Sequence, residues 1–172
     1  MDVSTARVAV VMGSDSDWET MQRTVTQLRA LGLEARVEVM SAHRCPERVA
    51  AFARSAHNDG IDVIIAAAGM AAHLAGAVAA NTTLPVIGVP IASGPLQGID
   101  ALLSTVQMPP GVPVATVGIG KAGATNAAIL AAQIIAAHDA DVRTAIESFK
   151  TEQAAGVDTK NAALQERLRD EC

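Results

Sequence analysis

A histidine and an arginine stand side by side in residues 41–45 (SAHRC), directly before Pro46. Imidazole gains and loses a proton near neutral pH, as a general acid/base must, and guanidinium binds phosphate or carboxylate. Because proline is favoured in the first turn of a helix, Pro46 predicts a helix start, with the preceding segment exposed on a loop. We therefore interpret His43 as a candidate acid/base and Arg44 as a candidate anion-binding residue.

A second segment, residues 13–19 (GSDSDWE), combines hydroxyl groups with a predicted helix start. Free backbone N–H groups at such a start can bind an anion or a ribose. Asp15 and Asp17 would repel a phosphate, but either could accept hydrogen bonds from sugar hydroxyls. Ser16 and Glu19 also have the spacing of a capping box, which needs no ligand. The segment alone leaves both interpretations open.

The third segment, residues 69–76 (GMAAHLAG), is rich in glycine and alanine. Small residues let backbone amides come close to a ligand. We predict that His73 lies one turn into the following helix. Its ring could face either the site or packed side chains, and the sequence favours neither.

These three segments follow β-branched runs that alternate with alanine-rich helical stretches. Strands joined by single helices require right-handed crossovers and a parallel sheet that is covered on both faces. We therefore predict one doubly wound α/β domain, a three-layer α/β/α sandwich of flavodoxin-like order, with ligands beyond the carboxyl ends of its strands. The expected strands cover 7–12, 34–40, 62–67, 85–89 and 114–118, and the expected helices 17–31, 46–58, 71–81, 98–107 and 123–138.

Residues 1–155 are expected to form this single catalytic domain, and residues 156–172 a charged C-terminal tail that is helical if ordered. A polar-faced helix, expected over 141–154, leads into the tail. Such a tail is more often a solvated arm or a subunit clasp than a catalytic element.

The composition excludes several classes of protein. The 172 residues are 50% hydrophobic, 18% charged and 2% aromatic, which excludes a disordered chain and a disulfide-stapled miniprotein. The formal net charge of -5 argues against nucleic acid as a partner, because a nucleic-acid binder needs a basic face and stacking aromatics. Cys45 and Cys172 fit reduced cytosolic thiols better than a disulfide framework.

No segment predicts a membrane partner. The N-terminus lacks the basic and apolar regions of a secretory signal, so we expect a cytoplasmic protein. Residues 63–80 are almost wholly apolar but mostly alanine, and we interpret them as strand, turn and buried helix. The mean hydropathy of +0.28 is high for a chain with few charges, so we expect apolar surface to be buried in a homo-oligomer.

Several sharper motifs fail when their requirements are examined. Residues 118–123 (GIGKAG) match the glycine fingerprint of dinucleotide sites, but no later strand with an acidic end follows, which disfavours a nicotinamide oxidoreductase. The phosphate-loop pattern fails at Ala115 and Ala122, and a phosphatase-type role for Cys45 fails at Ala51, where arginine is required. No clustered spacing predicts a metal site. The residues therefore indicate a cofactor-free anion site with one acid/base.

Five motifs occur together and in order: VVMGSDSDW at 10–18, SAHR at 41–44, AAHL at 71–74, LPVIGVP at 84–90 and STVQMP at 104–109. They closely resemble the N5-carboxyaminoimidazole ribonucleotide mutase family of purine biosynthesis, often called the catalytic subunit of phosphoribosylaminoimidazole carboxylase, over about residues 6–140. The resemblance implies a three-layer α/β sandwich assembled as a homo-octamer, with active sites at subunit junctions. It also implies a small ribonucleotide substrate whose carboxylate moves from N5 to C4 of the aminoimidazole, without a metal or organic cofactor.

The resemblance also implies roles for the loop residues. His43 would be the acid/base that protonates the departing amine and later takes the C4 proton. Asp17 would bind the ribose, Arg44 with Ser16 and Ser41 the phosphate, and the backbone of 69–71 with His73 would line a dry pocket for the carboxylate and CO2. The full substrate-binding set is Gly13, Ser14, Ser16, Asp17, Ser41, Ala42, Arg44, Gly69, Met70, Ala71, His73 and Leu74.

The chain departs from the family pattern in places. Many relatives have threonine at the position of Cys45 and a glycine-rich run where this chain has Ala67, Met70 and Ala75, so Met70 bears on how closely the backbone approaches the substrate. Two other functions stay open: direct carboxylation of aminoimidazole ribonucleotide with free CO2, and non-catalytic nucleotide binding by the same loops. The pair at 73–74 favours the mutase over the carboxylase.

Overall fold

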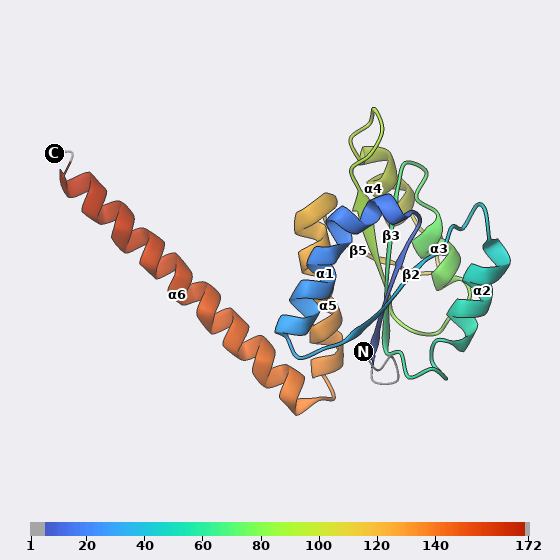
Figure 1. Ribbon diagram of the computed structural model, residues 1–172, viewed down its shortest axis with the longest axis horizontal. Helices are drawn as coiled ribbons and strands as arrows, with labels where there is room; N and C mark the ends of the chain where they lie inside the picture. Colours follow the sequence, from blue (N-terminus) through green and yellow to red (C-terminus); the bar gives the residue numbers. More distant parts are fainter. Residues whose placement is uncertain (1–5, 171–172) are drawn as a thin grey trace.

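The computed structural model describes residues 6–170, in which helices surround a single five-stranded sheet (Figure 1). All neighbouring strands are parallel, and their order is β2-β1-β3-β4-β5, the flavodoxin-like order of doubly wound folds. The predicted fold class is therefore confirmed. The strands are β1 (Val8–Met12), β2 (Ala35–Val39), β3 (Val63–Gly69), β4 (Val86–Ile91) and β5 (Ala115–Thr116), the last much shorter than expected.

Helices cover both faces of the sheet. α1, α5 and the start of α6 share one apolar cluster with the sheet, and α2 and α3 share the other. Thr105 of α4 and Ala75 of α3 both face Gly88 of β4. α4 therefore packs on the same side of the sheet as α3. The helices are α1 (Trp18–Ala30), α2 (Pro46–Ser55), α3 (Leu74–Ala79), α4 (Ile99–Val106), α5 (Gly120–Ala136) and α6 (Ala140–Asp170), with a short 3-10 helix, η2 (Asp15–Asp17).

The central strand β1 shows why the strand segments of the sequence are apolar at every position. All of its residues are buried. Val8, Val10 and Met12 face the helices α1 and α5, whereas Ala9 and Val11 face α2 and α3. Because side chains alternate across a strand, a sheet covered on both faces needs apolar residues at every position.

The apolar stretch over residues 63–80 forms β3, a turn and α3, as predicted. It therefore crosses the core as two short elements that lie on different layers. Within residues 6–170, no helix combines the length and the apolar character that a bilayer span requires.

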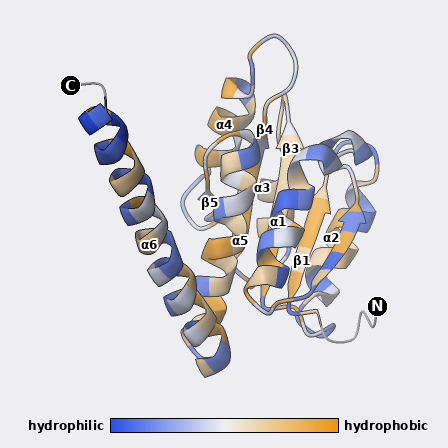
Figure 2. Ribbon diagram, turned by 60° about the vertical axis from the view of Figure 1, so that its left-hand side comes forward, coloured by the Kyte–Doolittle hydropathy of each residue, from blue (hydrophilic) through white to orange (hydrophobic). Residues whose placement is uncertain are grey.

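α6 is one continuous helix of 31 residues, where the sequence predicted a helix over 141–154 and a separate tail. Val142 and Ile146 are buried in the cluster that includes α5. The rest of the helix extends away from the sheet, with a surface that is largely hydrophilic (Figures 1 and 2). Residues 151–170 are all exposed, and the helix includes the expected tail up to Asp170. Cys172 lies outside the described residues.

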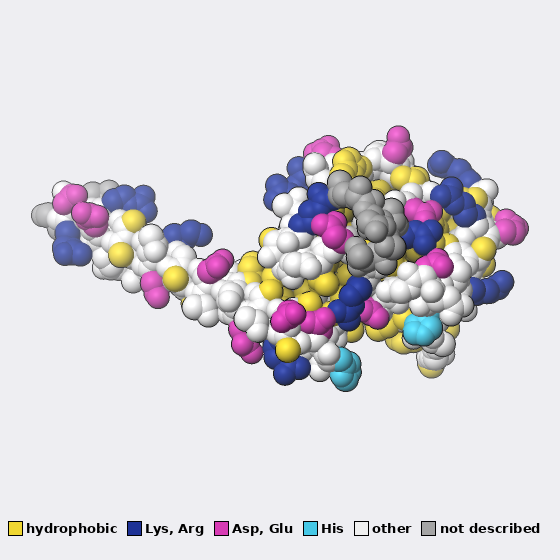
Figure 3. Space-filling view, turned by 60° about the horizontal axis from the view of Figure 1, so that its bottom comes forward, with side chains coloured by type: hydrophobic (Ala, Val, Ile, Leu, Met, Phe, Trp, Pro, Cys, Tyr) yellow, Lys and Arg dark blue, Asp and Glu magenta, His cyan; other side chains and the backbone are white. Residues whose placement is uncertain are grey.

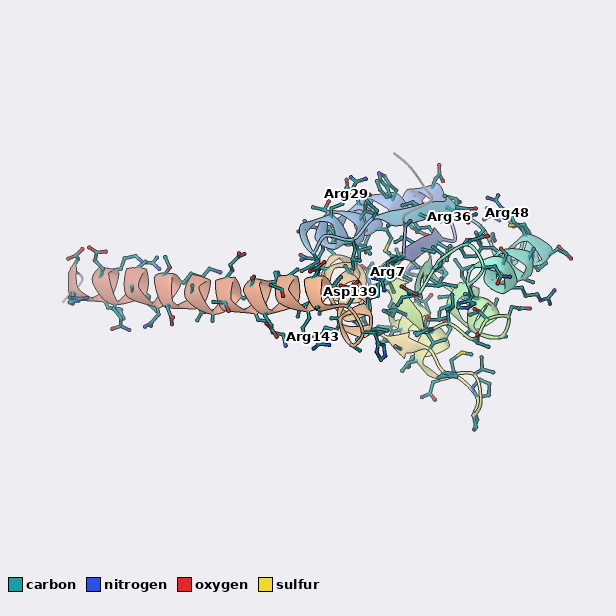
Figure 4. All side chains as sticks on the ribbon, turned by 90° about the horizontal axis from the view of Figure 1, so that it is seen from below. Arg7, Arg29, Arg36, Arg48, Asp139 and Arg143 are labelled. Atoms are coloured by element: carbon teal, nitrogen blue, oxygen red, sulfur yellow. The ribbon has the colours of Figure 1, made fainter. Side chains whose placement is uncertain are left out.

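An ion-pair cluster joins the turn before α6 to the amino ends of the strands. Arg7 donates hydrogen bonds to Asp139 and, over 2.6 Å, to Asp62, and Figure 4 shows Arg7 beside Asp139. The backbone N–H of Val142 and then Arg7 lower the pKa of Asp139 below its usual value. Arg143 donates to the carbonyl of Ala136. Acidic and basic side chains are intermixed on this end of the molecule (Figure 3), whereas the carboxyl ends of the strands lie opposite.

Gly88 in β4 generates a stability prediction, because a Cβ there would lie 2.3 Å from Thr105 Cγ2 and 2.9 Å from Val114 Cγ1. We expect Gly88→Ala to lower the free energy of unfolding by about 1–3 kcal/mol, since an overpacked core must shift. Urea titration followed by circular dichroism measures it. Gly156→Ala is the control: it meets no atom within 4 Å in exposed α6 and should raise stability by up to about 1 kcal/mol. Equal effects would contradict the packing argument.

Candidate active site

The candidate site is a pocket at the carboxyl edge of the sheet, with a cavity of about 240 Å3. Segments that follow β1, β2, β3 and β4 meet around it, as expected for a doubly wound fold. It is also lined by Ala68 in β3 and Ser93 after β4, which the sequence reasoning missed. Every predicted site residue lines this pocket: Gly13, Ser14, Ser16, Asp17, Ser41, Ala42, His43, Arg44, Gly69, Met70, Ala71, His73 and Leu74.

The segment after β1 is capped at Ser14. The capping box is formed by Ser14 and Asp17, and not by Ser16 and Glu19, whose spacing also fits one. Ser14 N donates to Asp17 Oδ2 over 3.1 Å, and Ser16 N donates back to Ser14 Oγ over 3.3 Å. Ser14 has extended backbone angles (φ -149°, ψ 155°), because β1 ends at Met12 and the turn follows at once. The box orients Asp17 toward the pocket.

Asp17 sits in a half-buried environment that changes its acidity. Burial raises the pKa of its carboxyl group, and the nearby charge of Asp15 adds to this rise. The hydrogen bond from the Ser14 backbone favours the charged form and opposes the shift, but it does not cancel it. The Ser14 backbone therefore holds the Asp17 carboxyl group in place at the pocket. A carboxyl group held in this way can accept hydrogen bonds from the hydroxyl groups of a ligand.

The segment after β2 is a closed turn. Cys45 N donates to the Ser41 carbonyl over 2.9 Å, and the Cys45 thiol accepts from Ser41 N over 3.2 Å. Arg44 N donates to Ser41 Oγ over 3.3 Å. Pro46 occupies the first turn of α2, as predicted. These bonds fix the backbone, while the side chains of His43 and Arg44 project from it, both exposed.

The structure brings His43 and His73 into contact across the pocket. His43 Nε2 lies 2.7 Å from His73 Nδ1, and the rings meet edge to face, with centroids 4.9 Å apart. One nitrogen must donate and the other accept, so each ring sets the tautomer of the other. The contact restrains the ring of His43, whose Nδ1 has no hydrogen-bond partner among residues 6–170 and can exchange a proton with a bound ligand.

His73 occupies the N-cap position of α3, so the prediction that it lies one turn into a helix is wrong. The helix starts later because the preceding residues form a turn. Ala72 N donates to Ser104 Oγ over 3.1 Å, and His73 N donates to the Ala71 carbonyl over 3.0 Å. With these bonds the backbone leaves β3, crosses the pocket edge and places the His73 ring at its surface.

Met70 directs the chain out of β3. It has a left-handed backbone (φ 52°) and a side chain that is 59% exposed. A side chain is rarely found in this conformation, which glycine adopts without strain. Its Cγ and Sδ lie 3.6 and 3.8 Å from where a Cβ on Gly94 would be. The Met70 side chain therefore packs over the loop after β4, and the backbone keeps the path that glycine would allow.

The glycine-rich segment at residues 118–123 has a packing explanation. A Cβ on Gly123 would lie 1.6 Å from the carbonyl oxygen of Gly118, so the start of α5 approaches the end of the sheet as closely as glycine permits. Lys121 pairs with Glu19 of α1 over 3.1 Å. These contacts join α5 to its neighbours and lie apart from the residues that line the pocket.

The residues of the pocket offer few ligands for a metal ion. His43 and His73 bond to each other, and Asp17 accepts from the Ser14 backbone. Across residues 6–170, no group of three or more histidine, cysteine, aspartate or glutamate side chains is arranged to hold a metal ion. The arrangement instead offers one acid/base pair, one arginine and several hydroxyl and backbone donors.

Comparison with known proteins identifies the family. Residues 7–156 match the AIR carboxylase family. The chain belongs to this family. It is 53% identical over 148 residues to an Escherichia coli K12 protein named N5-carboxyaminoimidazole ribonucleotide mutase, an alignment that covers 86% of this chain and 88% of the relative. A Mycobacterium tuberculosis relative of the same name is 52% identical, with 92% and 90% coverage.

Solved structures agree with this AIR carboxylase fold. The crystal structure of Treponema denticola PurE superposes with a TM-score of 0.83 at 27% identity and covers 91% of this chain and 97% of that one. The arrangement of the helices and the sheet is therefore that of the family fold. The family match ends at residue 156, so residues 157–170 of the exposed distal part of α6 lie beyond it.

The pKa of Asp17 yields a pH-dependent prediction. A raised carboxyl pKa means that the fold favours the protonated form, so this stabilisation is present below the unfolded pKa and is lost as pH rises through the folded pKa. We expect the free energy of unfolding of Asp17→Asn, relative to that of the parent, to increase as the pH rises from about 3 to about 6. The amide oxygen can still accept from Ser14 N. Urea titrations at several pH values measure the difference, and a difference that shrinks with rising pH would refute the prediction.

Proposed function

We propose that this protein is an N5-carboxyaminoimidazole ribonucleotide mutase of purine biosynthesis, converting its substrate to 4-carboxy-5-aminoimidazole ribonucleotide. The single observation that carries the proposal is the meeting of His43 with His73 in a pocket that also presents Arg44 and Asp17. Relatives of that name are 52–53% identical along most of both chains. The site offers what the reaction needs: a proton carrier, an anion ligand and a place for a ribose.

The reaction requires one proton to be transferred from the protein to the substrate and then taken back. Cleavage of the N5–carboxylate bond releases CO2 and leaves the electron pair on N5, which takes a proton from His43. C4 of the electron-rich aminoimidazole then attacks the retained CO2, and the proton that C4 loses returns to the imidazole, restoring the aromatic ring. The substrate ring supplies the electrons itself, so this sequence of steps calls on no cofactor.

The contact with His73 supports this role for His43. General acid/base catalysis requires the proton to point at the reacting atom, and the 2.7 Å bond restrains both the ring and its tautomer. His73 acts here as a positioning residue for His43. Both rings are exposed to the pocket rather than packed in the core.

The order of the strands suggests how the nucleotide lies. The segment after β2 carries Arg44 and Ser41, and the neighbouring segment after β1 carries Ser16, so we place the phosphate there. Asp17, also after β1, would bind the ribose hydroxyls. The base then reaches the backbone at residues 69–71, next to His73. Because guanidinium and backbone N–H groups act locally, an anionic substrate is compatible with a net charge of -5.

We further propose a cytoplasmic homo-octamer whose pockets lie at subunit junctions, with a small-molecule substrate and neither nucleic acid nor membrane as partner. Exposed apolar side chains support an oligomer: Ile99, Leu103 and Val106 lie along one face of α4, and Leu96 precedes it. These side chains are 49–58% exposed, and grouped apolar surface of this kind is typical of protein interfaces. The loop that precedes α4 borders the pocket through Ser93.

Direct carboxylation of aminoimidazole ribonucleotide is the competing reaction on the same site. We expect the wild-type protein to turn over N5-carboxyaminoimidazole ribonucleotide without added bicarbonate. A parallel assay supplies aminoimidazole ribonucleotide with bicarbonate, and both reactions are followed by formation of the common product. Efficient turnover in the bicarbonate assay, with no turnover of N5-carboxyaminoimidazole ribonucleotide, would show that the protein is the carboxylase and not the mutase.

The role of His43 is tested by His43→Asn. We expect turnover to fall about 100- to 10,000-fold, because general acid/base groups contribute effects of this size, while product affinity measured by calorimetry stays near that of the parent. Unchanged turnover would remove His43 from the mechanism. His57→Asn, in the turn after α2 and outside the pocket, is the matched control and should leave both quantities unchanged.

A further inference from the structure

Ser93 is the serine of the pocket whose hydroxyl group is unused. The other three lining serines hold side-chain hydrogen bonds: Ser16 Oγ donates to Ser14 Oγ over 2.8 Å, and Ser41 Oγ accepts from Arg44 N. Among residues 6–170, by contrast, the Ser93 hydroxyl has no hydrogen-bond partner. It is half-buried. Its oxygen is not among the buried unpartnered side-chain atoms of residues 6–170, so the hydroxyl is open to the pocket and free to bond a ligand.

The hydroxyl of Ser93 is held close to the end of β3. A Cβ on Gly69 would lie 2.1 Å from Ser93 Oγ and 3.2 Å from Ser93 Cβ. The hydroxyl therefore rests against the Gly69 backbone at a distance that only glycine permits. Because Gly69 lines the same pocket, this contact places a hydrogen-bond donor beside the backbone that we assign to the base and its carboxylate.

The loop over residues 92–98 is packed against neighbouring residues at two points, which limits the movement of Ser93. At its far end Gly98 has a left-handed backbone (φ 88°), and a Cβ there would lie 2.8 Å from Ile119 Cγ2 and 3.0 Å from Ala92 Cα. In the middle, Met70 packs over Gly94. A donor held in this way loses little freedom when it binds a ligand.

We infer that Ser93 is a further substrate-binding residue, whose hydroxyl donates a hydrogen bond to the migrating carboxylate. This inference rests on the proposed function and adds a residue to it. The phosphate and ribose groups lie at the segments after β2 and β1, whereas the segment after β4 adjoins β3 on the other side. Ser93 can therefore reach the base end of the nucleotide, where the carboxylate is the strongest hydrogen-bond acceptor. A hydrogen bond to a charged acceptor is stronger than one between neutral groups.

Two nucleotides that differ only in the carboxylate test the inference. We expect Ser93→Ala to weaken binding of 4-carboxy-5-aminoimidazole ribonucleotide about 10- to 100-fold and to change binding of aminoimidazole ribonucleotide less than about 2-fold. Calorimetry on the purified, full-length protein measures both. Equal losses for the two ligands, or no loss for either, would overturn the assignment.

Two further variants separate a binding role from a structural one. Ser93→Thr keeps a hydroxyl donor and should retain most of the affinity for the carboxylated nucleotide. Ser55→Ala removes a hydroxyl that bonds Phe52 and Asp59 outside the pocket and should change neither affinity. If the wild-type protein turns over N5-carboxyaminoimidazole ribonucleotide and Ser93→Ala binds both nucleotides normally, the role of Ser93 is refuted while the mutase proposal stands. If the wild-type protein shows no turnover, the mutase proposal itself fails.

Discussion

The pocket depends on the parallel register of β1 with the strands on either side. Met12 at the end of β1 is level with Val39 of β2 and Ala67 of β3. Met40 N donates to the Met12 carbonyl over 2.8 Å, and Gly13 N donates to the Ala67 carbonyl over 3.0 Å. β1 and β2 therefore leave the sheet at one height and β3 two residues later, and the ring of His43 meets that of His73 although they are far apart in the sequence. The buried alternation of β1 is what secures this register.

Much of the fold and of the site follows from local patterns in the sequence. Alternating β-branched and alanine-rich runs predict the parallel sheet, and the rule that ligands bind beyond the carboxyl ends of strands selects the correct loops. Local patterns fail where two of them compete. The spacing of Ser14 and Asp17 is that of Ser16 and Glu19, and the end of β1 decides between them. Ser93 follows β4, so the same rule points to its loop, but the approach of its hydroxyl to Gly69 is a tertiary contact that no local pattern predicts.

The two departures from the family pattern differ in physical cost. The thiol of Cys45 accepts a hydrogen bond from Ser41 N and donates one to the Ser41 carbonyl. Cysteine in place of threonine therefore leaves the loop that carries His43 closed. Met70 instead keeps a left-handed backbone with a side chain attached, a strain of order 1–3 kcal/mol that the surrounding contacts must offset. The strain sits directly between β3 and His73, where functional sites commonly hold it.

The length of α6 sets the outer dimensions of the subunit. A helix of 31 residues is about 46 Å long at 1.5 Å per residue, and its exposed residues 151–170 stand clear of the sheet (Figure 1). Such a rod adds friction out of proportion to its mass. Gel-filtration volumes calibrated with spherical standards would therefore overstate the molecular weight of the particle, and subunit counts are better taken from light scattering or sedimentation equilibrium, which weigh mass directly.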